Sequence, residues 1–301
     1  MMEKGNSNTP IRHHADTPLP RLTNPSVIKA LLDSLEHRPN KGLGQNYLID
    51  GNILSILVAA AEISTKDKLL EIGPGLGALT QALLATGAPL IAIEKDPPMV
   101  SHLKTHFPFD ATQDRHAFEL LEADVLNVNL NELFADGINK IVANLPYSVG
   151  SRFIVNALEA APLPERMVFM IQKEVADRLT AQPGGKTYGP LAIWSQLNYH
   201  VKNIKNVSPT CFMPAPKVGS AVVRFEKRAA PLAEVKDYAR FKRLVKTTFT
   251  QRRKQIGSNL RKNMPEFFQG LEKCGIDPTT RPEQIAIEQW VALADGGDTP
   301  Q

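Results

Sequence analysis

The chain has 301 residues, of which 43% are apolar and 22% are charged, and its formal net charge is +4. This composition is typical of a globular protein with one large domain, or with a large and a small one. Two cysteines are too few for a disulfide framework or a cysteine metal site, and we expect no bound metal. Apolar runs stay shorter than the roughly 18 residues of a membrane span, and no signal peptide is predicted. We therefore expect a cytoplasmic protein with no membrane partner.

The first 22 residues are rich in Pro, Asn, Thr and His and poor in apolar residues. Such a segment buries too little apolar surface to order itself, so residues 1–22 are predicted to be a disordered tail. Asn24 and Pro25 are expected to begin a short amphipathic helix that Pro39 ends. A loop with two glycines and two amides follows at residues 41–48, and a helix that packs on a sheet is predicted for residues 53–63.

Short apolar runs alternate with helical patterns from residue 68 onward. The predicted strands are residues 68–72, 89–93, 118–121, 140–143, 166–171, 201–207 and 218–225. Strands that alternate with helices indicate right-handed βαβ units, so we predict the α/β class with a doubly wound parallel sheet. After residue 229 the pattern is helical. The expected domains are therefore a sheet domain at residues 23–228 and a small all-helical domain at residues 229–301.

Glycines 73, 75 and 77 follow the first predicted strand and open a helix, which permits a tight turn and close approach of the backbone to a ligand. The stretch fits the dinucleotide pattern G-x-G-x-x-A, and Glu94 lies at the distance of a ribose-binding acid. A nicotinamide dinucleotide and S-adenosylmethionine both suit this loop, and a purely structural turn is the alternative. Asp124, at the end of the third strand, suits either an adenine amine or a helix cap.

The stretch Asn144-Leu145-Pro146-Tyr147 follows the fourth predicted strand. In open α/β sheets, ligands bind beyond the carboxyl ends of the strands. The amide oxygen of Asn144 and a backbone carbonyl suit the two N–H groups of an exocyclic amine on a planar base, while Tyr147 offers a ring for stacking. The stretch therefore favours methyl transfer to an amine over dinucleotide chemistry. The alternative is a simple strand-to-helix turn in which Pro146 is a breaker and Tyr147 fills the core.

Positive charge is concentrated near the carboxyl end of the chain. Residues 236–262 contain ten Lys or Arg and a single acid, Asp237. Such a block suggests a polyanionic partner, and a solvated basic helix face is the alternative. Arg252, Arg253 and Lys254 form its densest run.

Several segments together resemble the small-subunit ribosomal RNA adenine dimethyltransferase family of the kasugamycin-sensitivity type. The resemblance extends from about residue 22 to residue 293. It rests on residues 44–48 (Gly-Gln-Asn-Tyr-Leu), 71–77, 144–147, 172–175, 209–218 and 251–254. Tyr47 is a departure, since the family usually has phenylalanine there, but both residues offer a ring.

The resemblance implies a class I, Rossmann-like methyltransferase sheet with S-adenosyl-L-methionine as cofactor. Implied cofactor contacts are Asn46, Leu48, Gly73, Gly75, Glu94, Asp124 and Asn144. The implied catalytic residues are Asn144, Leu145, Pro146, Tyr147 and Phe212, with the target adenine between the Tyr147 and Phe212 rings. RNA contacts are implied for Arg252, Arg253 and Lys254. Cys211 is interpreted as a packed side chain, because attack by an exocyclic amine needs no cysteine nucleophile.

The implied reaction is dimethylation of N6 on two adjacent adenines in the 3′-terminal hairpin of 16S rRNA, during biogenesis of the small ribosomal subunit. The expected partner is 16S rRNA in a subunit precursor, and the expected oligomeric state is a monomer. Three alternatives stay open at this point: a large-subunit rRNA methyltransferase of the erythromycin-resistance type, an assembly factor in which binding outweighs catalysis, and a dinucleotide-dependent oxidoreductase.

Overall fold

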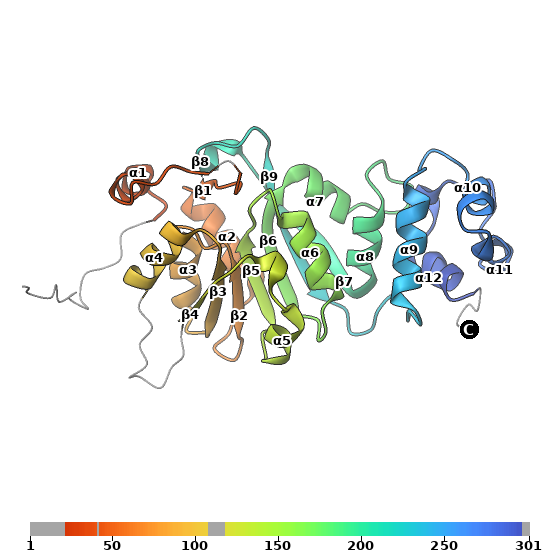
Figure 1. Ribbon diagram of the computed structural model, residues 1–301, viewed down its shortest axis with the longest axis horizontal. Coiled ribbons are helices and arrows are strands. Elements are labelled where there is room, and N and C mark those ends of the chain that lie inside the picture. Colours follow the sequence, from red (N-terminus) through yellow and green to blue (C-terminus); the bar gives the residue numbers. More distant parts are fainter. Residues whose placement is uncertain (1–21, 41, 108–117, 297–301) are drawn as a thin grey trace, which may run out of the picture.

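The computed structural model describes residues 22–40, 42–107 and 118–296. Its centre is a seven-stranded sheet with the order β4-β3-β2-β5-β6-β9-β7 (Figure 1). The strands are β2 (Leu69–Ile72), β3 (Leu90–Glu94), β4 (Phe118–Glu122), β5 (Lys140–Asn144), β6 (Arg166–Gln172), β7 (Tyr199–Val207) and β9 (Ser220–Lys227). The first five are parallel, and β9 is antiparallel to its neighbours β6 and β7. The predicted doubly wound α/β class is confirmed, with one reversed strand.

Helices cover both faces of the sheet, which is why its central strands read as continuous apolar runs. One face packs against α2 (Gly51–Ala61), α3 (Ala78–Leu84) and α4 (Pro97–His106); the other packs against α5 (Leu130–Ala135), α6 (Gly150–Glu159), α7 (Lys173–Leu179) and α8 (Pro190–Asn198). Alternate side chains of β5 point to opposite faces of the sheet. Val142 joins the first cluster, whereas Ile141 and Ala143 join the second.

The segment before the sheet begins with α1 (Pro25–Ser34), whose first turn is capped by the Asn24 side chain, as predicted. The helix ends before the expected stop at Pro39. Glu36 adopts a left-handed conformation (φ 49°), and the His37 N–H donates to the Leu32 carbonyl, which closes the helix. The predicted tail lies outside the described residues except for Leu22, which is buried in the core and therefore does not belong to a disordered tail.

Two short strands join distant parts of the chain. β1 (Tyr47–Leu48) pairs antiparallel with β8 (Phe212–Met213), and the Ile49 N–H donates to the Cys211 carbonyl at 2.8 Å. The sequence pattern predicts a loop at residues 41–48 and no strand between residues 207 and 218. Two-residue strands carry no periodicity, so their pairing depends on the tertiary structure.

The carboxyl-terminal helices are α9 (Tyr238–Phe249), α10 (Ile256–Asn263), α11 (Gly270–Lys273) and α12 (Ile287–Ala294). They lie at one end of the sheet (Figure 1). Their hydrophobic cluster, built around Phe241 and Trp290, also contains Ile193 and Leu197 of α8. The helical layer therefore shares its core with the sheet domain, and the boundary at residue 229 stays a prediction. Within the described residues, no helix is long and apolar enough to cross a membrane.

Candidate active site

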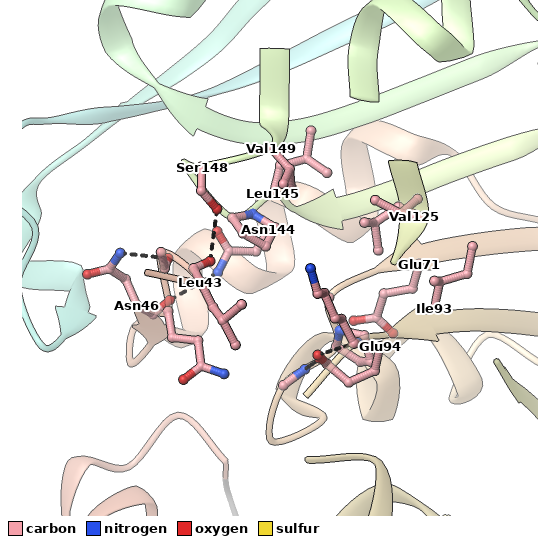
Figure 2. Close-up of a pocket in the computed structure, with 18 of the residues that line it drawn as sticks. Leu43, Asn46, Glu71, Ile93, Glu94, Val125, Asn144, Leu145, Ser148 and Val149 are labelled. Carbon is pink, nitrogen blue, oxygen red and sulfur yellow. Dashed lines mark hydrogen bonds between the residues drawn. The ribbon is translucent and has the colours of Figure 1, made fainter. Parts of the chain in front are cut away.

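A cleft opens at the carboxyl ends of β2, β3 and β5 and beside β4, where the strand order predicts a ligand site (Figure 2). The predicted residues that line it are Asn46, Leu48, Gly73, Gly75, Glu94, Asp124, Asn144, Leu145, Pro146 and Tyr147. Asn46 and Asn144 lie on one side of the cleft, and Glu71 and Glu94 lie on the other (Figure 2). Segments far apart in the sequence thus meet in one place.

The glycine loop at residues 73–77 approaches two other parts of the cleft too closely for side chains. Gly73 has φ +63°, and a Cβ there would lie 3.2 Å from Cγ of Pro146. Gly75 has φ +58°, and a Cβ there would lie 3.2 Å from Cε1 of Tyr47. Both positions require glycine for the backbone conformation and for the space. The loop, the Asn-Leu-Pro-Tyr turn and the amino-terminal segment therefore form one closely packed wall.

Glu94 ends β3 with its carboxylate fixed by backbone amides. One oxygen accepts from the Gly75 N–H at 3.0 Å, and the other accepts from the N–H groups of Lys95 and Asp96 at 2.8 and 2.9 Å. Burial raises the pKa of Glu94, and these three amides oppose that rise. Three of about four acceptor sites on the carboxylate are taken. A contact with both hydroxyls of a ribose would need one of these amides to give way.

Asp124 combines the two roles that the sequence left open. Its Oδ1 accepts from the Leu126 N–H at 3.0 Å, so it caps the 3₁₀ turn Val125–Asn127, and its Oδ2 pairs with Nζ of Lys95 at 2.8 Å. The Lys95 contact holds the pKa of Asp124 below its usual range, with further help from the cap and from Arg152. Asp124 also lines the cleft, so the cap does not exclude it from binding.

Glu71 is a cleft residue that the site prediction missed. It lies in the middle of the apolar strand β2, is 1% exposed, and accepts from the Thr80 hydroxyl at 2.7 Å. Burial raises its pKa to about 8, opposed by Thr80 and reinforced by the nearby Glu94. At neutral pH the carboxyl is therefore mostly protonated. The sequence does mark this position, because Glu71 is an acidic residue inside an otherwise apolar predicted strand.

Asn144 is the central polar side chain of the turn. Its Nδ2 donates to the backbone carbonyl of Asn46 at 3.3 Å (Figure 2). This bond orients the amide, and no described residue donates to its Oδ1. The next residue continues the ladder, because the Leu145 N–H donates to the Met170 carbonyl at 3.0 Å. Two acceptors of the kind that an amine needs, Oδ1 and the Leu145 carbonyl, therefore come from adjacent residues on a rigid strand end.

The rest of the turn is also fixed. The Pro146 carbonyl accepts from the N–H groups of Val149 and Gly150 at 3.1 and 3.0 Å. The half-buried Tyr147 shares a short hydrogen bond between its hydroxyl and that of the buried Ser220. Ser148 donates to the Leu43 carbonyl at 3.1 Å, which again joins the turn to the amino-terminal segment. The aromatic ring of Tyr147 is thus held in place at the cleft wall.

Phe212 is the one predicted catalytic residue that the structure does not bring into the cleft. Its side chain is 3% exposed and packs in the core cluster with Leu48 and Val207. It is absent from the cleft lining. Because β8 pairs with β1, the backbone of Phe212 still lies beside Leu48, one of the predicted cofactor contacts. A sandwich of adenine between Tyr147 and Phe212 stays a prediction that requires the Phe212 ring to move.

Gln45 holds the amino-terminal segment against the end of β3, a contact that sequence analysis did not predict. Its Nε2 donates to Oδ2 of Asp96 at 2.5 Å, and its Oε1 accepts from the Asn40 N–H at 2.8 Å. The same Oε1 lies 3.1 Å from Nε2 of His37. Asp96 is buried at the start of α4 but caps none of its amides. Its carboxylate is therefore used for this contact.

The basic run lies outside the cleft. Arg252, Arg253 and Lys254 occupy a turn between α9 and α10, so the alternative of a solvated helix face does not apply to these three residues. Arg253 and Lys254 are exposed. Arg252 instead contacts the chain itself: its Nε lies 3.7 Å from Oε2 of Glu283, and its guanidinium donates to the Gly185 carbonyl at 3.5 Å.

Within the described residues, no cluster of three or more histidine, cysteine or acidic side chains could hold a metal ion. Cys211 is partly buried, its Sγ lies 3.5 Å from Oδ2 of Asp50, and burial and this carboxylate raise the pKa of its thiol. A raised thiol pKa is the opposite of what a nucleophilic cysteine needs, and it agrees with the interpretation of Cys211 as a packed residue.

The strand order, the reversed strand β9, the glycine loop after β2 and the acidic residues after β3 and β4 define a class I S-adenosylmethionine-dependent methyltransferase. Comparison with known proteins narrows the class. The family model described as "Ribosomal RNA adenine dimethylase" matches residues 36–296. The chain belongs to this family, and its methyl donor is S-adenosylmethionine. The dinucleotide-dependent oxidoreductase is thereby excluded.

Among similar proteins, "Ribosomal RNA small subunit methyltransferase A" of Opitutus terrae is 40% identical over 277 residues, covering 89% of this chain and 97% of the relative. The protein of that name from Pseudomonas aeruginosa is 38% identical over 261 residues, covering 86% and 95%. The crystal structure of 23S rRNA methyltransferase ErmE matches with a TM-score of 0.62 and 26% identity, covering 84% of this chain and all of the other. A dimethyladenosine transferase from Plasmodium falciparum shares the fold, with a TM-score of 0.68 and 24% identity over 82% and 95% of the chains.

The residues of the cleft fit the cofactor. Glu94 and Asp124 offer carboxylates for hydroxyl and amine groups, and the glycine loop at residues 73–77 lines the same cleft. Which of these atoms contact the cofactor stays a prediction.

Proposed function

We propose that this chain dimethylates N6 of two adjacent adenines in the 3′-terminal hairpin of small-subunit ribosomal RNA, acting in the cytoplasm as a monomer on a subunit precursor. The family supports adenine dimethylation, and the two relatives described above, whose names specify the small subunit, support the substrate. The observation that carries the chemistry is the oriented Asn144 amide beside the Leu145 carbonyl and the glycine loop.

Adenine N6 is a weak nucleophile because its lone pair is delocalised into the ring. We propose that Oδ1 of Asn144 and the Leu145 carbonyl accept the two N6 hydrogens. These contacts favour a more tetrahedral nitrogen, whose lone pair then points at the methyl group. S-adenosylmethionine supplies an electrophilic sulfonium methyl group when bound. Positioning by a rigid strand end, without a strong base or a covalent intermediate, then provides most of the acceleration.

Tyr147 is proposed to stack on the target adenine. A base taken out of a structured RNA loses its stacking, and an aromatic face returns about 1–3 kcal/mol per stacked base. The hydrogen bond to Ser220 supports this role because it fixes the ring without using its face. Phe212 would complete the stack only after leaving its buried position.

Arg253 and Lys254 are proposed to contact RNA phosphates. Both are exposed in the turn between α9 and α10, in a stretch that contains few acids. Phosphate contacts of this kind set the register and orientation of the RNA without reading its sequence.

The second candidate is a large-subunit rRNA methyltransferase of the erythromycin-resistance type. The observation in its favour is the fold match to ErmE over the whole of that chain. The higher identity to proteins named for the small subunit favours the first candidate. Both candidates use the same cleft chemistry, so only the RNA separates them.

The experiment incubates the protein with labelled S-adenosylmethionine and unmethylated small or large ribosomal subunits, followed by nucleoside analysis. We expect N6,N6-dimethyladenosine in the 3′ hairpin of the small subunit, and its loss in Asn144→Ala. Label in large-subunit RNA alone would move the protein to the second candidate. Cofactor binding without transfer to either RNA would favour an assembly factor. An Asn144→Ala variant that rescues subunit assembly without methylation would show that both roles coexist.

A further inference from the structure

A second groove lies outside the cofactor cleft, where α6, α7 and α8 lie side by side on one face of the sheet (Figure 1). It is lined by Ser151, Arg152, Val155, Asn156, Arg178, Pro190, Leu191 and Trp194. The first two turns of α6 form one wall and the start of α8 forms the other. The proposed reaction at the cleft uses none of these side chains.

The charge of this groove is positive. Arg152 and Arg178 are exposed, and neither forms an ion pair or hydrogen bond with any described residue. Arg152 lies near enough to Asp124 to help lower the pKa of that carboxyl, but Asp124 is paired with Lys95 at 2.8 Å. None of the described residues that line the groove is acidic. Two nearby carboxylates are engaged elsewhere: Glu159 accepts from Lys242, and Asp177 pairs with Lys173 at 2.7 Å. The groove therefore suits an anion.

Backbone donors add to this positive charge. The N-caps of α6 and α8 are Val149 and Gly189, and neither side chain caps the helix. The Gly150 N–H is taken by the Pro146 carbonyl and Pro190 has no N–H, so the donors at the groove are the second and third N–H groups of each helix, together with the positive ends of the helix dipoles. Nε1 of Trp194 has no hydrogen-bond partner within the described residues, but this atom is buried below the groove surface and is not counted among these donors.

The groove is continuous with the active site. Arg152 lines both the groove and the cofactor cleft. The helix that carries it begins at Gly150, three residues after Tyr147. A strand of RNA whose target base reaches Tyr147 would therefore pass Arg152 on leaving the cleft.

We propose that the groove binds a phosphodiester group of the RNA strand that flanks the target adenine, through Arg152, Arg178 and the free N–H groups at the starts of α6 and α8. This inference rests on the proposed function, since it names a substrate contact for the same reaction. Guanidinium groups and helix N-termini are the usual partners of phosphate. The groove positions the strand, and the cleft performs the chemistry.

The test compares the full-length protein with the Arg152→Gln and Arg178→Gln variants. Binding to unmethylated small subunits is titrated over a salt series, and kcat and KM are measured for the same subunits. For Arg152→Gln we expect roughly 3- to 10-fold weaker binding, a matching rise in KM, and a salt slope shallower by about one. Arg152→Lys should recover the slope because it keeps the charge. Arg178→Gln should weaken binding in the same direction, because it removes the other guanidinium group of the groove.

Lys66→Gln is the matched control, because it removes one exposed charge from the turn before β2. An equal change of slope in Lys66→Gln, or an unchanged slope and KM in Arg152→Gln, would overturn the proposal. A change in S-adenosylmethionine affinity alone would also overturn it, by limiting Arg152 to the cofactor cleft. In each of these outcomes the unaltered protein still methylates small subunits, so the proposed function stands and only the groove proposal fails. If the unaltered protein does not methylate small subunits, the proposed function fails, whatever the salt slopes of the variants.

Discussion

The side chain of Asn144 donates to the backbone carbonyl of Asn46, a residue 98 positions earlier in the chain. The segment that carries Asn46 also carries Leu48 and Gln45, which line the cofactor cleft. The acceptor proposed for the adenine amine is therefore oriented by the same segment that is predicted to cover the cofactor. This contact links cofactor binding to the geometry of the methyl acceptor.

Asn144→Asp tests this link. Aspartate keeps an acceptor oxygen but has no N–H for the Asn46 carbonyl, and it places a negative charge against that carbonyl. We expect kcat to fall by roughly 100-fold, because a small displacement of the acceptor disrupts the reacting geometry. Methyl transfer under saturating substrates is the measurement. Asn52→Asp adds a similar charge on the exposed start of α2 and should leave kcat unchanged; an equal loss there would contradict the prediction.

Gly73→Ala should weaken cofactor binding. Alanine at φ +63° costs about 1–2 kcal/mol, and its Cβ would also press on Pro146 at 3.2 Å. We expect the Kd for S-adenosylmethionine, measured by calorimetry, to rise roughly tenfold. Gly137→Ala is the control, since it has φ +94° and nothing within 4 Å of the added Cβ. Both variants should lose similar stability, but only Gly73→Ala should lose affinity.

The sequence predicted the strand ends well because each is marked locally. A buried run of apolar residues stops, and a polar or glycine residue follows it, as at Glu94 and Asn144. In a parallel sheet these ends share one edge, so the position of the cleft follows from the pattern alone. Glu71 carried a comparable local signal, a charge in an apolar strand, that the site prediction did not use.

Other features depend on contacts that no local pattern records. Gln45 meets Asp96 across 51 positions, and β1 meets β8 across more than 160. The family resemblance implies that the Phe212 ring contacts the target adenine, but the burial of this ring depends on the packing of β8 on the core. Arg252 and Arg253 are adjacent and chemically identical, and only the fold gives one an internal partner and leaves the other exposed.

Tyr147→Phe and Tyr147→Ala separate the hydroxyl of this residue from its ring. Phenylalanine loses the hydrogen bond to Ser220, which should cost about 1 kcal/mol of stability and change kcat/KM by less than about threefold. Alanine loses the stacking face and should lower kcat/KM by about 10- to 100-fold. Equal losses in the two variants would show that the hydroxyl, and not the ring, is the functional group.

Glu71→Gln should change how stability depends on pH. The pKa of Glu71 is raised from 4.5 to about 8, so the folded protein holds a proton that the unfolded chain releases. Its contribution is fully present below pH 4.5 and is lost as pH rises toward 8. Glutamine can still accept from Thr80 but does not titrate. The difference in free energy of unfolding between variant and parent should therefore grow in favour of the variant from pH 5 to pH 8. A constant difference would contradict the raised pKa.

Arg252→Gln should affect stability, whereas Arg253→Gln should affect RNA binding. Removing Arg252 leaves the mostly buried Glu283 carboxylate without its cation, so we expect a loss of about 1 kcal/mol and a Tm lower by about 2–4 °C. Removing Arg253 should leave Tm unchanged but make the salt dependence of RNA binding shallower by about one. Calorimetric melting and binding titrations measure the two effects. A Tm loss confined to Arg253→Gln would contradict the assignment.

The position of β9 between β6 and β7 fixes the order in which the molecule can be completed during synthesis. Both neighbours leave the ribosome before β9 does, yet among the strands that the structure describes β7 pairs with β9 alone. Likewise, β1 waits for β8, which is made more than 160 residues later. Ser220, the partner of Tyr147, is the first residue of β9. A nascent chain that ends before residue 212 therefore lacks the partner of β1, and one that ends before residue 220 lacks the partner of Tyr147, so we expect the chain to become competent for methyl transfer only late in its own translation.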